Sequence, residues 1–230
     1  MARAIHAASR RRRPYHHGNL RRALLDEALA TIRAEGVEGL TLREIGSRAG
    51  VSRTALYRHF ADKRALLAAV ATEGFRTLRQ QLVAAWEEGG RGRAALDSMG
   101  TAYVRFAVAN PSHYRVMFGG FLEPNDRETE LAAEGAGAFQ ALVDALAALQ
   151  RDAVVRGDDT LTMARFIWAL VHGVAMLGID AQLHEQDGVE KLTRYAFERL
   201  QTGIAAATAG RPARSRTRRS TVGRRPASAR

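Results

Sequence analysis

The chain has 230 residues and no cysteine, which allows one or two domains with a sizeable core and excludes disulfides, thiol sensors and thiolate metal sites. The arginine-rich first 13 residues lack the apolar segment of a signal peptide, and the longest apolar run, Phe166 to Ile179, is too short to span a bilayer and contains His172. We therefore expect a soluble, cytoplasmic protein.

The formal net charge of +11 is concentrated in two terminal arms. Residues 1–13 carry five arginines, residues 210–230 carry eight, and neither segment has an acidic residue. Subtracting both arms leaves −2 for residues 14–209. The composition of the arms predicts disorder. Such arms attract nucleic acid by releasing counterions, but they also occur as solvated tails that aid solubility, and the sequence leaves both interpretations open.

Between the arms the chain is expected to be all-α. Apolar residues recur at helical spacing, alanine is abundant and strand-like alternation is absent. The pattern predicts these helices in chain order: about 18–35, a short one between Thr41 and Gly50, about 53–59, 63–87, 94–109, 111–118, 128–155, 160–183 and 188–207.

Three short, well-capped helices near the N-terminus are the most informative feature. Thr41 and Glu44 have the spacing of a capping box, Ser52 can cap the next helix, and Gly50 permits a tight turn between the two. This length and spacing is typical of a helix-turn-helix over residues 41–60. The second helix of that motif fits the DNA major groove, where its first side chains reach base edges.

The same residues resemble the TetR/AcrR family of transcriptional regulators. The resemblance covers about 18–76, and many positions agree at fixed spacing across four helices. It is carried by Leu40-Thr41-Leu42-Arg43-Glu44-Ile45, Ala49-Gly50-Val51-Ser52, Leu56-Tyr57-Arg58-His59-Phe60 and Lys63-Arg64-Ala65-Leu66-Leu67.

The resemblance implies a division of roles within the motif. Residues facing base edges would be Arg43, Arg53, Thr54, Ala55 and Arg58. Residues holding phosphates would be Thr41, Ser52, Tyr57, His59 and Lys63. The chemistry agrees, because arginine can bind guanine O6 and N7 with two hydrogen bonds and a methyl group can contact thymine. Thr41 and Ser52 are also expected to cap helices, and His59 has packing as an alternative role.

For the C-terminal half the resemblance implies a helical bundle that binds a small molecule. Trp168, His172 and Gly173 are similar to the Trp…His-Gly motif of one subfamily of sensor domains. Core or dimer packing is the favoured interpretation of this helix face, and a pocket wall is the alternative. The candidate ligand-binding residues are Tyr103, Phe106, Tyr114, Met117, Phe118, Trp168, His172 and Met176.

The resemblance also implies a homodimer formed by the last two long helices. The candidate interface residues are Leu161, Ala164, Trp168, Leu183, Leu192, Tyr195 and Leu200. Such a dimer would read a near-palindromic operator and, as a repressor, leave it when a small-molecule effector binds. The expected organisation is a basic arm (1–13), a helix-turn-helix DNA-binding domain (14–76), a ligand-sensing and dimerisation domain (77–209) and a basic tail (210–230).

Other function classes have less support in the sequence. Phosphate-binding, nucleophile-elbow and zinc-protease motifs are absent, no two histidines are four residues apart, and no cofactor or metal site is expected. An enzyme is therefore not indicated. An architectural protein that binds any duplex is the rival suggested by the arginine arms, and a scaffold or pure ligand-binding bundle is the third alternative.

Overall fold

The computed structural model describes residues 20–122, 130–184 and 187–205, which contain nine α-helices and no strand. The all-α prediction is thus confirmed for these residues, and the two basic arms lie outside them. The helices are α1 (Leu20–Glu35), α2 (Leu42–Arg48), α3 (Arg53–Tyr57), α4 (Lys63–Glu88), α5 (Arg93–Ala109), α6 (Pro111–Phe118), α7 (Glu130–Arg151), α8 (Thr160–Ile179) and α9 (Gly188–Ile204).

Local side chains start the short helices where the sequence predicts. The Thr41 hydroxyl accepts a hydrogen bond from the Glu44 backbone N–H at 3.3 Å, and Ser52 accepts one from Ala55 at 3.2 Å. Asp62 accepts one from Ala65 at 2.7 Å. Each bond satisfies a donor that the first turn of a helix leaves free, so these three caps fix the register of α2, α3 and α4.

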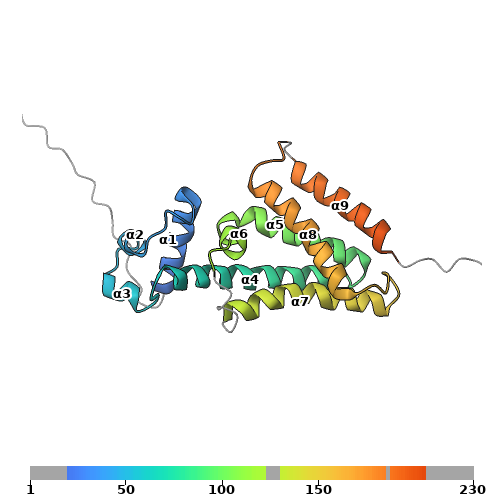
Figure 1. Cartoon of the computed structure of the whole chain (residues 1–230), viewed down its shortest axis with the longest axis horizontal. Helices are drawn as coiled ribbons and strands as arrows, with labels where there is room; N and C mark the ends of the chain where they lie inside the picture. The colour runs from blue at the N-terminus through green and yellow to red at the C-terminus, as the bar shows by residue number, and fades with distance from the viewer. Residues whose placement is uncertain (1–19, 123–129, 185–186, 206–230) are drawn as a thin grey trace, which may run out of the picture.

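The first three helices form a small domain at one end of the molecule (Figure 1). Its core is made of fully buried aliphatic side chains from α1, α2 and α3, among them Leu24, Ile45 and Leu56. Gly46 lets α2 approach α3 closely, because a Cβ there would lie 3.0 Å from the Leu56 side chain. The turn between these helices passes through Gly50, whose φ of +68° favours glycine.

The remaining helices form a bundle around α4, which begins in the N-terminal domain and extends through the molecule (Figure 1). It packs against α5, α6 and α7, while α8 packs on α5, α7 and α9. Gly100 of α5 allows the Phe197 ring of α9 to lie directly on the helix backbone, since a Cβ there would be 1.7 Å from that ring. The two ends of α4 therefore belong to different parts of the molecule.

One helix has the length and hydropathy of a membrane span. Within the described residues this helix is α8. The apolar run from Phe166 to Ile179 was expected to be too short to span a bilayer, but α8 begins six residues earlier, at Thr160, and is therefore long enough. Core helices of soluble proteins pass the same test. A third of its most apolar window is buried within the chain, so α8 leaves much apolar surface uncovered.

The close packing of α5 on α9 generates a prediction. Gly100→Ala should destabilise the fold by about 1–3 kcal/mol, because the added methyl group overlaps the Phe197 ring and overpacked cores respond on this scale. Urea unfolding measures the change. Gly137→Ala is the matched control in α7, where the new Cβ would meet only the flexible Arg79 side chain. Equal stability of the two variants would contradict the packing described here.

Candidate nucleic-acid interface and candidate ligand cavity

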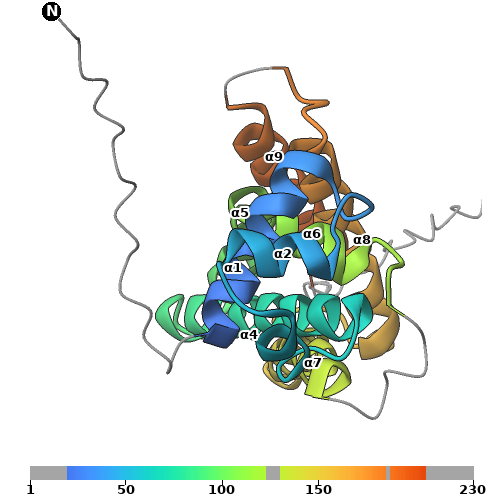
Figure 2. The same cartoon turned by 90° about the vertical axis from the view of Figure 1, so that its left-hand side faces the viewer.

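The residues predicted to contact DNA lie on or beside α2 and α3, at the end of the molecule seen in Figure 2. Eight of the ten are exposed, whereas Ala55 and Lys63 are half-buried. Tyr57 is 45% exposed although its ring is a large apolar surface. A short helix with this exposed composition has the geometry needed to enter a major groove.

Several of these side chains keep hydrogen-bonding capacity after their internal contacts. Thr41 and Ser52 use an oxygen lone pair to cap their helices, so each hydroxyl hydrogen can still be donated to a phosphate. Lys63 donates to the Glu38 carbonyl oxygen at 3.2 Å and retains two of its three N–H donors. Capping and phosphate binding are therefore compatible at these positions.

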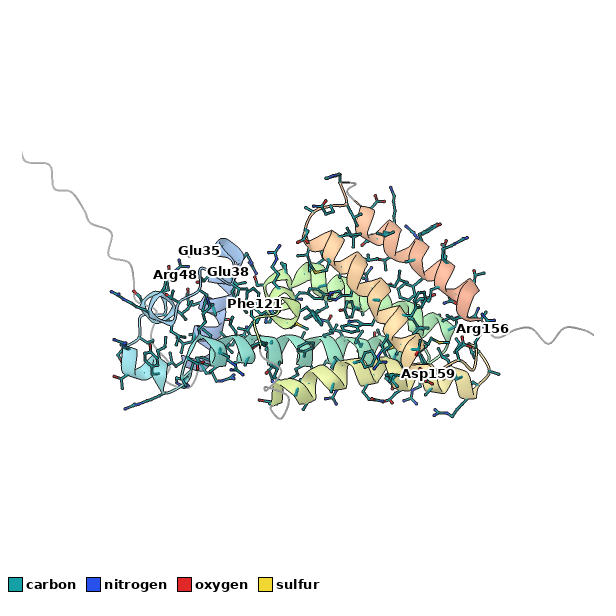
Figure 3. The ribbon with its side chains drawn as sticks, in the orientation of Figure 1. Glu35, Glu38, Arg48, Phe121, Arg156 and Asp159 are labelled. Atoms are coloured by element: carbon teal, nitrogen blue, oxygen red, sulfur yellow. The ribbon has the colours of Figure 1, made fainter. Side chains whose placement is uncertain are left out.

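The arginines of the helix-turn-helix fall into two groups. Arg48 forms salt bridges with Glu35 at 2.6 Å and Glu44 at 2.5 Å, so it joins α2 to α1; Figure 3 shows Arg48 beside Glu35. In the part of the chain that the structure describes, Arg43, Arg53 and Arg58 have no ion pair.

Arg53 instead lies 5.6 Å from the centre of the Tyr57 ring, a cation–π contact that holds the two side chains together on the exposed face of α3. Three of the four motif arginines thus keep their guanidinium donors available to a nucleic acid.

A cavity of about 280 Å³ lies among α4, α5, α6, α7 and α8. Its wall is almost entirely apolar. Of the residues predicted to bind a ligand, Tyr103, Phe118 and Trp168 line it. The other lining residues are Phe75, Leu78, Leu82, Leu96, Met99, Gly100, Gly135, Ala138, Phe139, Leu142, Arg165, Ile167 and Val171.

The other predicted ligand residues lie elsewhere. Phe106 and Met117 are buried in the core, and Met176 packs against it. Met117 fills the space above Gly74 of α4, where a Cβ would lie 2.5 Å from its sulfur. None of these three lines the cavity, and neither do Tyr114 and His172. Helical spacing groups residues on one helix but does not say which neighbouring helix covers them, so it could not predict which of these positions face the cavity.

A chain of hydrogen bonds runs behind the cavity wall from α8 through α5 and α6 and back to α8. The Trp168 indole N–H donates to the Tyr103 hydroxyl at 3.2 Å. The Tyr103 and Tyr114 hydroxyls are 2.9 Å apart, and the Tyr114 hydroxyl is 2.7 Å from His172 Nδ1. Because indole only donates, these contacts fit a run of donors that ends at an accepting His172 Nδ1.

Burial keeps this hydrogen-bond chain neutral. It lowers the pKa of His172 and raises the pKa of both Tyr103 and Tyr114, because each charged form would lose hydration. At pH 7 the imidazole is therefore uncharged and both phenols are protonated. Among the described residues no buried side-chain nitrogen or oxygen lacks a partner, so the polar groups beside the cavity are already satisfied.

A second polar junction joins the N-terminal domain to the bundle. Arg22 of α1 donates to Glu73 of α4 at 2.8 Å, and His113 of α6 lies 3.5 Å from the same carboxylate oxygen. Burial lowers the pKa of His113, and Glu73 opposes that effect only in part. Sequence reasoning missed this junction, because its three members are far apart in the chain and each has an ordinary surface residue type.

The surface of α8 and α9 has an apolar groove lined by Phe166, Leu170, Leu192 and Tyr195, among others. Phe166 is 58% exposed and Tyr195 is 59% exposed. Among the predicted interface residues, Leu161 is also exposed and Leu183 and Leu192 are half-buried. Ala164 and Leu200 are buried, although Leu200 also lines this groove, and Trp168 lines the cavity while its side chain stays 38% exposed.

Comparisons with known proteins place this geometry in a family. Residues 24–70 match bacterial regulatory proteins of the tetR family, and residues 96–200 match the tetracyclin repressor-like C-terminal domain. A protein of unknown function from Rhodococcus sp. RHA1 is 33% identical, with a TM-score of 0.75 over 84% of this chain and 100% of that one.

Two further comparisons agree. YobS of Bacillus subtilis (strain 168), an uncharacterised HTH-type transcriptional regulator, is 27% identical over 177 residues, which are 76% of this chain and 88% of YobS. A tetR-family regulatory protein from Rhodococcus RHA1 shares the fold, with 22% identity and a TM-score of 0.64 over 82% of this chain and 98% of that one.

The matched segments contain the exposed helix-turn-helix and most of the bundle with its cavity. The described residues contain no group of three or more His, Asp or Glu side chains able to hold a metal ion. The chain therefore belongs to the TetR family of bacterial transcriptional regulators, which are DNA-binding proteins and not enzymes.

Proposed function

We propose that this protein is a homodimeric repressor of a near-palindromic operator and that a small molecule in the cavity releases it from DNA. The observation that carries the proposal is the combination of arginines without an ion pair on α2, on α3 and at the end of α3 with an apolar cavity in the bundle, joined through α4. Residues 14–76, with the motif at 41–60, would read DNA, and residues 77–209 would sense and dimerise. A protein with this function would act in the cytoplasm.

The contact roles follow from exposure and pairing. Arg43, Arg53 and Arg58 have free guanidinium groups suited to guanine edges, and Thr54 and Ala55 offer methyl groups to thymine. Thr41, Ser52, Tyr57, His59 and Lys63 carry hydroxyl, imidazole or ammonium groups suited to phosphates. Lys63 opens α4, where backbone N–H groups also favour an anion.

The uncovered apolar surface supports dimerisation through α8 and α9. Phe166 and Tyr195 are too large and too exposed for an isolated chain to present together without cost. A second copy related by a two-fold axis would cover both with the same pair of helices. The two motifs could then lie about 34–36 Å apart, one turn of DNA.

Release by a ligand requires that the cavity and the N-terminal domain respond together. Phe118 of α6 lines the cavity and Tyr114 of α6 belongs to the hydrogen-bond chain behind it, while His113 faces the Arg22–Glu73 pair. A ligand that displaces α6 would therefore change the contacts that hold α1 against the bundle. Typical allosteric coupling of about 1–3 kcal/mol is enough to reduce operator occupancy.

Selection of bound sequences from a random duplex pool tests the function. We expect the full chain and a version trimmed to residues 14–209 to enrich the same palindrome, with a preference of about 10³ or more over random DNA. Equal binding of all duplexes by the full chain, and none by the trimmed version, would favour the architectural alternative suggested by the arms. No enrichment by either version would refute operator recognition.

Single substitutions in the motif should separate base reading from phosphate binding. Arg58→Ala should remove discrimination at one base position in each half-site, at about 1–3 kcal/mol. Lys63→Ala should weaken binding to all sequences alike and reduce the slope of log affinity against log salt by about one per half-site. Binding assays over a set of operator variants and salt concentrations distinguish the two.

Arg48→Ala is the control for the arginine substitution, because Arg48 is tied to Glu35 and Glu44. It should reduce stability only slightly, because surface ion pairs contribute little, and leave base preference unchanged. If Arg48→Ala relaxed base preference and Arg58→Ala did not, the assignment of base-reading arginines would be wrong.

Phe166→Asp should yield monomers that bind the operator weakly. The charge would be buried without a partner in the proposed interface, whereas in a single chain it stays in water because Phe166 is 58% exposed. Light scattering measures the mass. Val83→Asp is the control, since Val83 is 43% exposed on α4 and should leave the dimer intact. Full-size dimers of the Phe166 variant would exclude this face as the interface.

A further inference from the structure

The aromatic side chains of the cavity come from four different helices and face one another. Phe118 of α6 lies 6.3 Å from Trp168 of α8, and Phe139 of α7 lies 5.8 Å from it. Phe75 of α4 meets Phe118 edge to face at 5.4 Å. Aromatic rings prefer edge-to-face and offset contacts with other rings over such distances, so these walls favour a flat aromatic guest.

The volume limits the guest to a compact one. At about 280 Å³ the cavity lies just below the usual range for small-molecule sites. Its polar wall groups, the Tyr103 hydroxyl and the Trp168 indole, are hydrogen-bonded to each other. A guest rich in hydroxyls would bury its own polar groups without partners, which is costly. The body of the guest should therefore be apolar.

One lining residue departs from this apolar character. Arg165 is the single charged side chain on the wall. It lies one turn before Trp168, which in turn lies one turn before His172, so the three share one stripe of α8. Arg165 is exposed and forms no ion pair among the residues that the structure describes.

The carboxylate of Asp159, which interacts with Arg165, has another role. Asp159 interacts electrostatically with Arg165, but its carboxylate accepts the Thr162 backbone N–H at 2.7 Å and caps α8. Hydrogen bonding from the Thr162 side chain, and next from its backbone N–H, lowers the pKa of Asp159. Figure 3 shows Asp159 at the end of the bundle farthest from the N-terminal domain. The Arg165 guanidinium therefore keeps donors for a further anion at the cavity rim.

We propose that the cavity binds a compact aromatic monocarboxylic acid, with its rings packed against Phe139, Phe118 and Trp168 and its carboxylate on Arg165. The inference rests on the proposed function, since it names the chemical class of the effector. A single arginine suits one carboxylate, because planar guanidinium groups bind carboxylates with two parallel hydrogen bonds. A cationic guest is disfavoured by the same charge.

The test compares 2-naphthoate with its neutral isostere 2-naphthamide on the full chain without DNA. We expect the acid to bind about tenfold more tightly by calorimetry, as a charge-assisted hydrogen bond predicts. The acid should also quench Trp168 fluorescence in a Trp86→Phe background, which leaves Trp168 as the remaining tryptophan. Equal affinity of acid and amide would overturn the anion preference, and tighter binding of decanoate would overturn the aromatic one.

Two variants locate the guest. Arg165→Gln should abolish the tenfold preference for the acid, while Arg151→Gln, an exposed control on α7, should keep it. Gly135→Leu should abolish binding of both compounds by filling the cavity, and the change also favours helix in α7. Unaltered binding by Gly135→Leu would place the guest elsewhere.

The two proposals fail separately. An enriched operator with no 2-naphthoate binding would refute the ligand class alone. Binding of 2-naphthoate with no enriched operator would refute the repressor function alone.

Discussion

The carboxylate of Glu73 is the point on which the arrangement of the molecule depends. It lies in the middle of α4 and accepts from Arg22 of α1 while it faces His113 of α6. Beside it, Gly74 lets Met117 of α6 lie against the α4 backbone. The helix α4 starts at Lys63 in the DNA-binding end and continues along the cavity. In the proposed mechanism, a change in the packing of α6 on α4 therefore affects both the DNA-binding end and the cavity.

The cavity is neutral inside and charged at its rim, because the polar groups of its wall are hydrogen-bonded to neighbouring side chains. Trp168, Tyr103, Tyr114 and His172 satisfy one another, so they connect three helices without exposing a donor to the cavity. In the proposed mechanism, a guest beside Trp168 presses on this hydrogen-bond chain or on Phe118, and both include residues of α6. Binding energy at the apolar wall is thereby available to shift the position of α6.

Features that depend on residues close together in the sequence could be predicted, and contacts between helices far apart in the sequence could not. The caps at Thr41, Ser52 and Asp62 depend on residues three positions away, so the starts of α2, α3 and α4 could be predicted. The cavity combines Phe75, Phe139 and Arg165 from three separate helices, and no spacing rule relates them. Likewise Arg48 and Arg58 look alike in sequence, and only their neighbours distinguish a structural arginine from a free one.

The central claim is that occupancy of the cavity sets the spacing of the two DNA-binding ends in a dimer. The chain lacks cysteine, so Ala34→Cys on the exposed side of α1 carries one spin label per protomer. Pulsed electron spin measurements then give the distance between the two labels, with the selected operator and with the cavity filled by Gly135→Leu. We expect a single narrow distribution of label–label distances when the dimer is bound to the operator. In the Gly135→Leu dimer, we expect the distances to shift away from that distribution. Identical distributions in filled and unfilled dimers would contradict the claim.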